Sequence, residues 1–373
     1  MILQYIKNVY ITFSDSGHQH PRVKTGSALA KAGLRKIVLK RLMSSLKRTP
    51  TLPPGTKPLD NQVAGHQTAD GKIGCLVHED GTVLKPVQVP PKGQTEVEFY
   101  QEVFGEQAST DKVLLQLREL VPKFHGIVHA PKEPDVRFMK LENLLQDMRQ
   151  PCVLDIKMGR KTYDPFASKE KIAMETAKFP PAKNLGYQIS GMLTYSPKTG
   201  KFQKFDKYFC KKLNEETIVF EGFGKFFAID GVLQKEVIKA VIERLEQILE
   251  WFHKQRTFNF FASSLLVVFD GDISPSPSSH PNSSLSSSGL DGGNITHNCC
   301  NGETDSIIEN DFSDLVSSDS VDDKTTNPPD SPHPKVQVRM IDFAHVYHMT
   351  EEDENYIFGL KHLIDDFRRL LKS

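Results

Sequence analysis

Two charged residues interrupt an apolar run in PCVLDIKMG, at residues 151–159. The apolar residues around them predict a buried β-strand. Asp155 and Lys157 stand two positions apart, so a strand projects both side chains from the same face. Charged side chains are rarely fully buried unless they are paired or bind something. The two residues therefore form either a structural ion pair or part of the wall of a site for a charged ligand.

Lys85 is a second lysine on a predicted strand, in a β-hairpin expected over residues 71–89. Most lysines on strands lie on a solvated face. The functional alternative is a lysine that clamps nucleotide phosphates, because phosphoryl transfer needs cations that hold and neutralise them. An acid on the helix that follows would orient such a lysine. Glu96 is the first choice for that acid and Glu98 the second.

Asp342 comes at the end of an apolar strand, in the segment RMIDFAH. An aspartate at such a position either caps the following turn or holds Mg²⁺, which prefers one or two carboxylates together with phosphate oxygens and water. The chain has no HRD catalytic loop, no GxGxxG motif and no Walker lysine motif. Their absence argues against an ordinary protein kinase and against a P-loop enzyme.

Basic residues outnumber acids between Lys157 and Lys212. Such a run is usually a solvated surface. Beside a phosphotransfer site it would also suit a small, densely anionic substrate, because it would raise the local concentration of the substrate and hold its phosphates. Nucleic acid is disfavoured as a partner, because the aromatic residues in this stretch follow no RNA-binding pattern.

The composition is that of a soluble globular protein, with 38% hydrophobic and 25% charged residues among 373. The 47 basic and 47 acidic side chains cancel. No apolar run reaches the roughly 18 residues of a membrane span. The five cysteines show no CxxC spacing and no pairing framework, which favours a reducing compartment.

Two segments differ from the rest of the chain in composition. Residues 1–50 carry ten Lys or Arg and one acid, and residues 1–60 are expected to form a basic, disordered arm. Residues 272–334 are rich in Ser and in acids and contain a single basic residue. That composition buries too little apolar area to offset the entropy of ordering, which predicts a disordered insertion.

The remaining chain predicts alternating helices and strands. Helices are expected over residues 95–104, with Glu96 and Glu98 in the first turn, and over 111–120, 168–179, 233–252 and 354–371. Strands are expected over 75–77, 82–87, 136–145, 258–271 and 335–341. These patterns rest on apolar residues at helical or alternating spacing, with turn residues between them.

Three segments together resemble the inositol polyphosphate kinase family. PCVLDIKMG resembles the PxxxDxKxG signature of that family, ASSLLVVFDG its SSLL element, and VRMIDFAHV its metal-binding IDF element. The three occur in the order and with the spacing of the family. The resemblance implies an α+β, two-lobed fold distantly akin to protein kinases. Residues 61–145 would form the ATP-binding lobe, and residues 146–271 with 335–373 the C-terminal lobe that binds inositol phosphate.

The resemblance also implies roles for individual residues. Lys85 would hold ATP phosphates, and Glu142 and Leu144 would hold adenine through backbone groups. Asp155 would contact the ribose or orient the reacting hydroxyl, and Lys157 would face the transferring phosphate and the inositol ring. Asp342 would bind Mg²⁺, with Ser264 a weaker candidate. The implied contacts to substrate phosphates or hydroxyls are Lys92, Lys157, Lys171, Lys178, Lys207 and His345.

Within the family, GRKTYDPFAS after the signature resembles the multikinase branch. The implied reaction transfers the ATP γ-phosphate to inositol 1,4,5-trisphosphate and inositol tetrakisphosphate, giving inositol pentakisphosphate. The alternatives are a hexakisphosphate kinase, a kinase of phosphoinositide headgroups, and a non-catalytic scaffold. Met174 and Glu175 depart from the polar amides expected in some relatives, and an acid there would repel a phosphate. The family further implies a monomer in the nucleus and cytoplasm.

Overall fold

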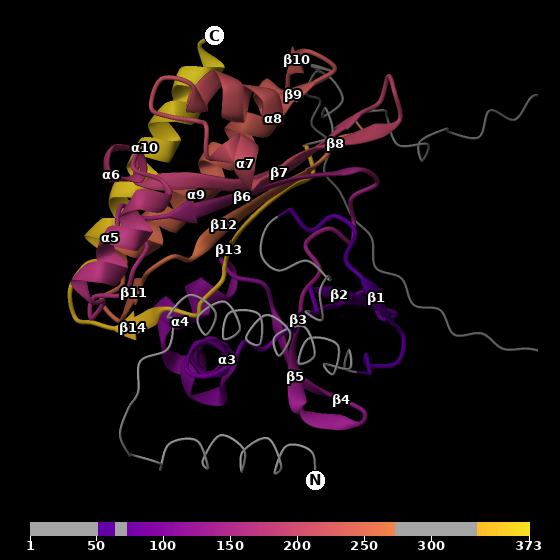
Figure 1. The fold of residues 1–373 in the computed structure, drawn as a ribbon, viewed down its shortest axis with the longest axis vertical. Helices are drawn as coiled ribbons and strands as arrows, with labels where there is room; N and C mark the ends of the chain where they lie inside the picture. Colours follow the sequence, from indigo (N-terminus) through magenta and orange to yellow (C-terminus); the bar gives the residue numbers. More distant parts are fainter. Residues whose placement is uncertain (1–50, 64–72, 273–333) are drawn as a thin grey trace, which may run out of the picture.

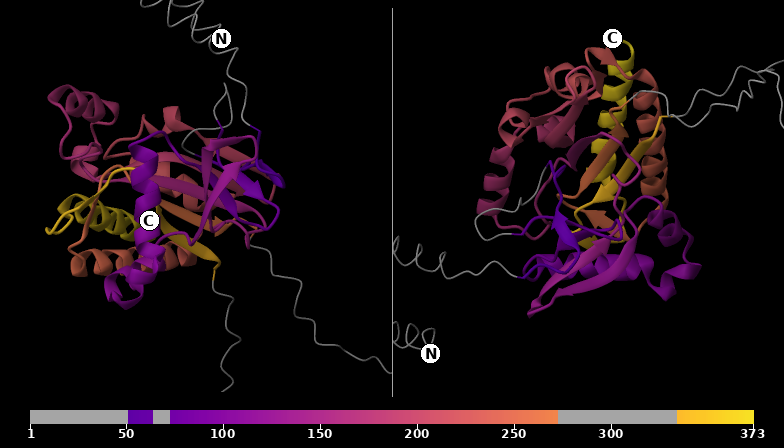
Figure 2. Two further views of the ribbon diagram at one scale, coloured as in Figure 1. Left: turned by 90° about the horizontal axis from the view of Figure 1, so that it is seen from below. Right: turned by 90° about the vertical axis from the view of Figure 1, so that its right-hand side faces the viewer.

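The computed structural model describes residues 51–63, 73–272 and 334–373, which form two lobes (Figure 1). The first lobe, residues 51–63 and 73–145, contains one antiparallel sheet and two helices. The second lobe, residues 146–272 and 334–373, contains a larger helical part around a second antiparallel sheet. The perpendicular views of Figure 2 show the first lobe packed against one end of the second. The predicted α+β, two-lobed fold is confirmed, while the predicted domain boundaries stay a prediction.

The sheet of the first lobe has the strand order β1-β2-β3-β5-β4. Its strands are β1 (Thr56–Pro58), β2 (Leu76–His78), β3 (Val83–Pro86), β4 (Phe124–Ala130) and β5 (Glu133–Leu141). β2 and β3 form the predicted hairpin, in which Leu76 pairs with Leu84. The expectation that residues 1–60 are entirely a disordered arm is wrong for β1, which pairs with the free edge of β2. Residues 1–50 of that arm lie outside the described residues.

The helices of the first lobe are α3 (Lys92–Phe104) and α4 (Lys112–Arg118), separated by a 3₁₀ turn, η1 (Glu106–Thr110). The start predicted for α3, at residue 95, is wrong. Pro91 directly precedes the helix, where the fixed φ of proline suits a helix start. Glu96 and Glu98 therefore lie beyond the first turn, which contains no acid.

The sheet of the second lobe has the order β13-β12-β6-β7-β8, so β6 is its central strand. Its strands are β6 (Pro151–Met158), β7 (Tyr187–Ser196), β8 (Lys201–Phe205), β12 (Ser264–Asp270) and β13 (Val336–Ile341). Ser264 on β12 stands opposite Lys157 on β6, and Leu266 stands opposite Asp155. Because every neighbour in this sheet is antiparallel, Asp342 is placed just past the end of β13, beside the start of β12.

The predicted strand over residues 258–271 is two strands. β11 (Phe258–Phe260) leaves the central sheet to pair with β14 (Val346–His348), and β12 begins only at Ser264. The chain turns between them, with Ala262 at a φ of 56°. Apolar content alone could not reveal this break, because both strands are buried.

Two long amphipathic helices cover the sheet of the second lobe (Figure 1). They are α9 (Lys235–Lys254) and α10 (Glu354–Leu371), and the predicted bounds of α10 are confirmed. The shorter elements are α5 (Lys169–Lys178), α6 (Ala182–Leu185), α7 (Lys207–Cys210), the π-helix η2 (Ile218–Gly224), α8 (Lys225–Phe227), β9 (Ala228–Ile229) and β10 (Val232–Leu233).

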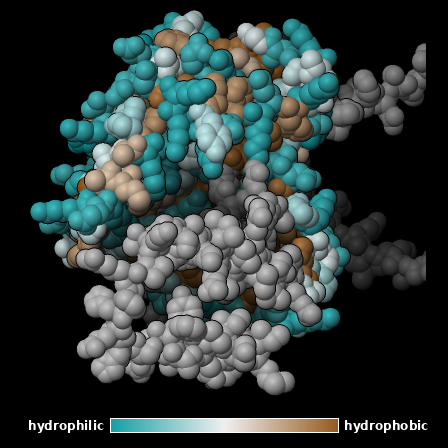
Figure 3. Space-filling model, in the orientation of Figure 1, coloured by the Kyte–Doolittle hydropathy of each residue, from teal (hydrophilic) through white to brown (hydrophobic). Residues whose placement is uncertain are grey.

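Polar side chains dominate the face of the second lobe shown in Figure 3, with apolar ones scattered between them. None of the helices in the described ranges combines the length and the apolar character needed to span a bilayer. Of the predicted insertion, residues 273–333 lie outside the described part of the chain.

A close backbone approach locks α10 against the turn between α6 and β7. A Cβ atom built on Gly359 would lie 2.1 Å from the carbonyl oxygen of Gly186. The same carbonyl accepts a hydrogen bond of 2.7 Å from the amide of Gly159, just after β6. This contact therefore fixes α10 relative to the end of the strand that carries Asp155 and Lys157.

We expect Gly359→Ala to lower the free energy of unfolding by about 2 kcal/mol, because the added methyl group must displace backbone atoms. Thermal unfolding followed by circular dichroism measures this. Gly224→Ala is the control, since its Cβ atom would meet nothing closer than 3.6 Å. Equal melting temperatures for Gly359→Ala and the wild type would show that the two elements are not locked together.

Candidate active site

Lys85, in the first lobe, binds one carboxylate of its own lobe and one of the second lobe. Its Nζ donates to Oε1 of Glu96 at 2.6 Å and to Oδ1 of Asp342 at 2.5 Å. Glu96 is fully buried on α3, and its Oε1 also accepts from the backbone amide of Phe343 at 3.1 Å. The structure thus brings Lys85 to Glu96, the first choice made from the sequence. Glu98, the second choice, accepts instead from the side chain of Gln94.

The charges of this cluster stabilise one another. Burial lowers the pKa of the Lys85 ammonium, but Asp342 and Glu96 raise it more, so the pKa lies well above its ordinary value. Burial raises the pKa of Asp342, but the charge and the hydrogen bond of Lys85 lower it more, so this pKa lies below its ordinary value. Both groups are therefore ionised at neutral pH, as a site for a phosphate and a cation requires.

Asp155 lies beside Asp342 with one oxygen unused. It is only 6% exposed on β6, and among the described residues no hydrogen-bond donor reaches its Oδ1. Burial and the charge of Asp342 raise the pKa of Asp155 to about 6, against the lowering effect of the Ser264 and Ser190 hydroxyls. A buried polar atom without a partner is costly, so this oxygen is a ready acceptor for a ligand.

Asp155 and Lys157 do not form a direct ion pair in the described part of the chain, although Lys157 acts on Asp155 electrostatically. The structural ion pair considered from the sequence is therefore not formed. Lys157 lies at the junction between two regions. Its charge acts on Asp155 and Asp342, and its side chain lines a neighbouring cavity.

The oxygens of Asp342, Asp155 and Ser264 form a donor set that fits Mg²⁺, which binds oxygen ligands and needs only one or two carboxylates. Ser264 is 1% exposed and lies within reach of Asp155. Within the described ranges no three His, Cys, Asp or Glu side chains converge as a metal site. An ion held here would therefore need phosphate or water oxygens to complete its coordination.

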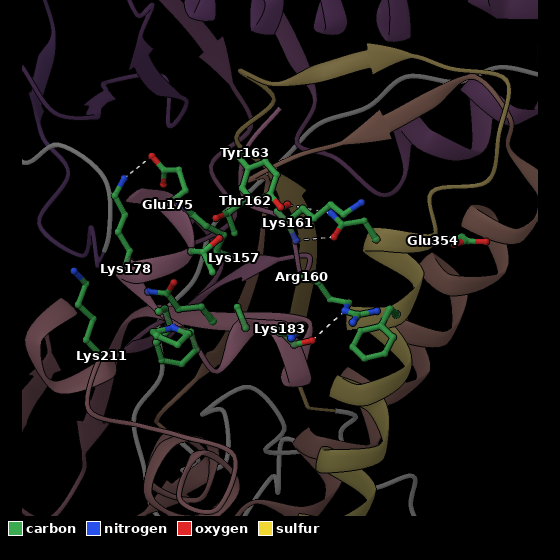
Figure 4. A pocket seen from close by; sticks show the side chains of 17 residues that line it. Lys157, Arg160, Lys161, Thr162, Tyr163, Glu175, Lys178, Lys183, Lys211 and Glu354 are labelled. Carbon is green, nitrogen blue, oxygen red and sulfur yellow. Dashed lines mark hydrogen bonds and ion pairs between the residues drawn. The ribbon is translucent and has the colours of Figure 1, made fainter. Parts of the chain in front are cut away.

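The cavity beside Lys157 has a volume of about 650 Å³ and is referred to below as the basic pocket (Figure 4). Six cationic side chains line it: Lys157, Arg160, Lys161, Lys178, Lys183 and Lys211. Two carboxylates, those of Glu175 and Glu354, also line it. These residues come from β6, the loop after it, α5, α6, the residues after α7 and the start of α10. The excess of positive charge suits a ligand that carries several phosphates.

Neutral groups position the cations at the α10 side of the basic pocket. The guanidinium of Arg160 lies over the ring of Phe358 at 4.5 Å, and its Nε donates to the carbonyl of Lys183 at 3.0 Å. The side chain of Asn355 holds the backbone of Lys161 through both its amide and its carbonyl. Within the described ranges neither Arg160 nor Lys161 is ion-paired with a carboxylate, so their positive charge is available to a ligand.

The implied substrate residues fall into two groups. Lys157 and Lys178 line the basic pocket, and their contacts to substrate stay a prediction. Lys92, Lys171 and His345 form a second cluster, in which Lys171 is paired with Asp164. The structure does not bring Lys207 into the pocket lining, because its ammonium lies over the ring of Tyr208 at 5.2 Å.

The loop after β5 contains the two residues implied to hold adenine. Leu144 is buried, and the Glu142 side chain accepts from the backbone amide of Lys123. The backbone amide of Glu142 in turn donates to the carbonyl of Lys123 at 2.9 Å, so two hydrogen bonds fix the start of the loop. The role of this loop stays a prediction.

Sequence reasoning gave no individual role to Arg160, Lys161, Lys183 or Lys211. All four belong to the basic stretch between residues 157 and 212. The density of lysines was a signal that a basic surface exists. It could not show which lysines meet, because their elements are brought together only by the fold.

A sequence profile described as inositol polyphosphate kinase matches residues 138–368, more than half of the chain. This chain belongs to the inositol polyphosphate kinase family. The match includes the strands that carry Asp155, Lys157 and Ser264, and also Asp342. The family expected from the three sequence motifs is thereby confirmed.

Comparison with individual proteins of the family gives the same result. The mouse inositol polyphosphate multikinase is 33% identical over 87% of this chain and 94% of its own length. The human inositol hexakisphosphate kinase 2 is 29% identical over 64% of this chain and 52% of its own length. A solved inositol phosphate multikinase of S. cerevisiae, in complex with ADP and Mn²⁺, shares the fold with a TM-score of 0.51 at 20% identity, covering 78% of this chain and 99% of its own.

We expect His345 to be neutral at pH 7. Burial and then the charges of Lys92 and Lys171 lower its pKa from the ordinary 6.5. Since the unfolded chain binds this proton more readily, the contribution of His345 to stability is lost as the pH falls below about 6.5.

NMR titration of the His345 imidazole should give a pKa below 6.5, and this pKa should rise in Lys92→Met. The charge-matched Lys132→Met, on the exposed β4–β5 turn, should leave it unchanged. If the pKa of His345 were the same in Lys92→Met as in the wild type, Lys92 would not lie close enough to His345 to form the second cluster.

Proposed function

We propose that this protein is an inositol polyphosphate multikinase. It transfers the γ-phosphate of ATP to hydroxyls of inositol 1,4,5-trisphosphate and of inositol tetrakisphosphate, with inositol pentakisphosphate as the end product. One observation carries the proposal: Lys157 joins the charged cluster of Lys85, Asp342 and Asp155 to the basic pocket. One region suits a nucleotide with its metal, and the other suits a small anion that carries several phosphates.

The yeast relative solved with ADP and Mn²⁺ supports a nucleotide and a divalent cation as the cofactors, here ATP and Mg²⁺. Lys85 would hold the nucleotide phosphates, and the backbone at Glu142 and Leu144 would hold adenine. Asp342, Asp155 and Ser264 offer the oxygens for Mg²⁺. A bound Mg²⁺ would supply charge neutralisation to the phosphates.

The chain itself contributes charge and orientation to the reaction. A loose phosphoryl transition state needs little covalent chemistry from the protein, so positioning and electrostatic stabilisation dominate. Lys157 would face the negative charge that develops on the transferred phosphate. The free oxygen of Asp155 accepts a hydrogen bond from a hydroxyl, and both the ribose of ATP and the inositol ring present one. Lys178, together with Arg160, Lys161, Lys183 and Lys211, would hold the phosphates already on the inositol.

The multikinase branch is favoured over the hexakisphosphate kinases by the extent of the match. The alignment with the mouse multikinase covers 94% of the length of that protein, whereas the alignment with the human hexakisphosphate kinase 2 covers 52%. A phosphoinositide headgroup carries the same chemistry as a soluble inositol phosphate and is included among the candidate substrates. A monomer located in the nucleus and cytoplasm is proposed from the family and from the ten basic residues among positions 1–50.

Incubating the purified protein with Mg-ATP and separating the products by anion-exchange chromatography tests the proposal. We expect conversion of the trisphosphate to a pentakisphosphate. Conversion of the hexakisphosphate but not the trisphosphate would assign the protein to the hexakisphosphate kinases. Binding of these compounds without any turnover would favour a scaffold.

We expect Asp342→Asn and Lys157→Met each to lower kcat/KM by at least about 100-fold, the typical cost of removing one group that stabilises transition-state charge. Lys201→Met, on the exposed strand β8, is the control and should retain wild-type activity. Steady-state kinetics with the trisphosphate measures the effect. Near-normal turnover in Asp342→Asn would mean that the active site lies elsewhere.

A further inference from the structure

The basic pocket contains a carboxylate among its lysines. Glu354 lies exposed at the start of α10, on one side of the pocket (Figure 4). Glu175 lies on the opposite side, on α5, and its side chain is only 19% exposed. Its Oε1 accepts from Nζ of Lys178 at 2.6 Å, as the dashed line in Figure 4 marks. Glu175 is thus the less exposed of the two carboxylates in a pocket lined by six cationic side chains.

Glu175 acts on both lysines of its helix face. It is paired with Lys178, and its charge also raises the pKa of Lys171, after the larger effect of the Asp164 hydrogen bond. The neighbouring Met174 is 55% exposed and offers no hydrogen bond in place of the carboxylate. This part of the wall therefore has far less positive charge than the side formed by Arg160, Lys161 and Lys183.

Helix stability does not require this carboxylate. An ion pair three residues apart on a helix, with one partner half exposed, contributes only a few tenths of a kcal/mol. α5 has its own cap, because Ser168 accepts from the backbone amide of Lys171. The placement of Glu175 is better explained by what it does to a ligand. A carboxylate accepts hydrogen bonds from hydroxyl groups and repels phosphates.

We propose that Glu175 is a specificity-determining residue of the basic pocket. It favours an inositol that carries a free hydroxyl at the position facing α5, and it disfavours a fully phosphorylated inositol. This inference rests on the proposed function, since it assigns the pocket to the inositol phosphate. It goes further by naming the residue through which a pocket with six cations would discriminate against a fully phosphorylated inositol.

The test uses the full-length protein, with inositol hexakisphosphate as the fully phosphorylated probe. Isothermal titration calorimetry measures its binding without any need for turnover. Glu175→Gln should bind the probe about tenfold more tightly than the wild type, the order expected for removing one like charge close to a phosphate. The gain should shrink as salt is raised, because exposed charges are screened. An unchanged affinity would overturn the proposal.

Glu250→Gln is the matched control. Glu250 pairs with Lys254 at 2.6 Å on α9, outside the pocket, so the substitution makes the same change in net charge. It should leave the affinity for the probe at the wild-type value. If Glu250→Gln also bound the probe tenfold more tightly, the effect would come from the net charge of the protein, and the role proposed for Glu175 would be wrong.

A second pair of variants separates Glu175 from its partner. In a Lys178→Met background, Glu175→Gln should still tighten binding of the probe several-fold, because the carboxylate itself repels the phosphate. If Glu175→Gln did not tighten binding of the probe in this background, Glu175 would act only by pairing with Lys178 and keeping it from the ligand. That result would overturn the proposal.

Kinetics with the trisphosphate completes the test. Glu175→Gln should raise KM for the trisphosphate several-fold with little change in kcat, because a hydrogen bond to a bound hydroxyl is weakened. An unchanged KM would overturn the contact to that hydroxyl. A wild-type protein that phosphorylates no inositol phosphate would refute the proposed function, while calorimetry would still report on Glu175.

Discussion

The bridge from Lys85 to Glu96 and Asp342 is the interaction on which the active site depends. It joins a strand and a helix of the first lobe to the end of a strand in the second lobe. Lys85 alone would be a poorly solvated cation, and the two acids alone would repel each other. Together they leave one net negative charge, close to the unused oxygen of Asp155. The arrangement therefore both aligns the lobes and leaves charge available for a metal.

Aromatic packing gives this bridge its rigidity. Phe343 follows Asp342 directly, and its ring lies 4.2 Å from that of Phe99 on α3. Phe99 also contacts Phe258 and Phe260 of β11, edge to face. All four rings are buried. Because Phe99 stands three residues after Glu96 on the same helix, the core that packs the lobes together also fixes the carboxylate that holds Lys85.

The parts of this site that could be predicted from the sequence are those set by short-range pattern. Asp342 follows an alternating strand, and α10 begins after the capping side chain of Asp353, so the positions of both were readable. The prediction that Glu96 is the acid that pairs with Lys85 was also correct. What could not be read was that Glu96 binds the amide of Phe343, 247 residues away. The early start of α3 was missed although Pro91 directly before it is a local signal, whereas the break between β11 and β12 depends on a distant strand partner.

The two sides of the basic pocket differ in how their cations are held, and this difference has a physical consequence. The guanidinium of Arg160 is positioned by an aromatic ring and a carbonyl, and the backbone of Lys161 by an amide, and in the described part of the chain neither side chain is paired with a carboxylate. On the α5 side, Lys178 is paired with the carboxylate of Glu175. A phosphate that approaches the first side meets cations that are not ion-paired within the described ranges, whereas one that approaches the second must compete with Glu175 for Lys178. The pocket is therefore polarised, and a ligand with an uneven distribution of phosphates and hydroxyls would bind in one preferred orientation.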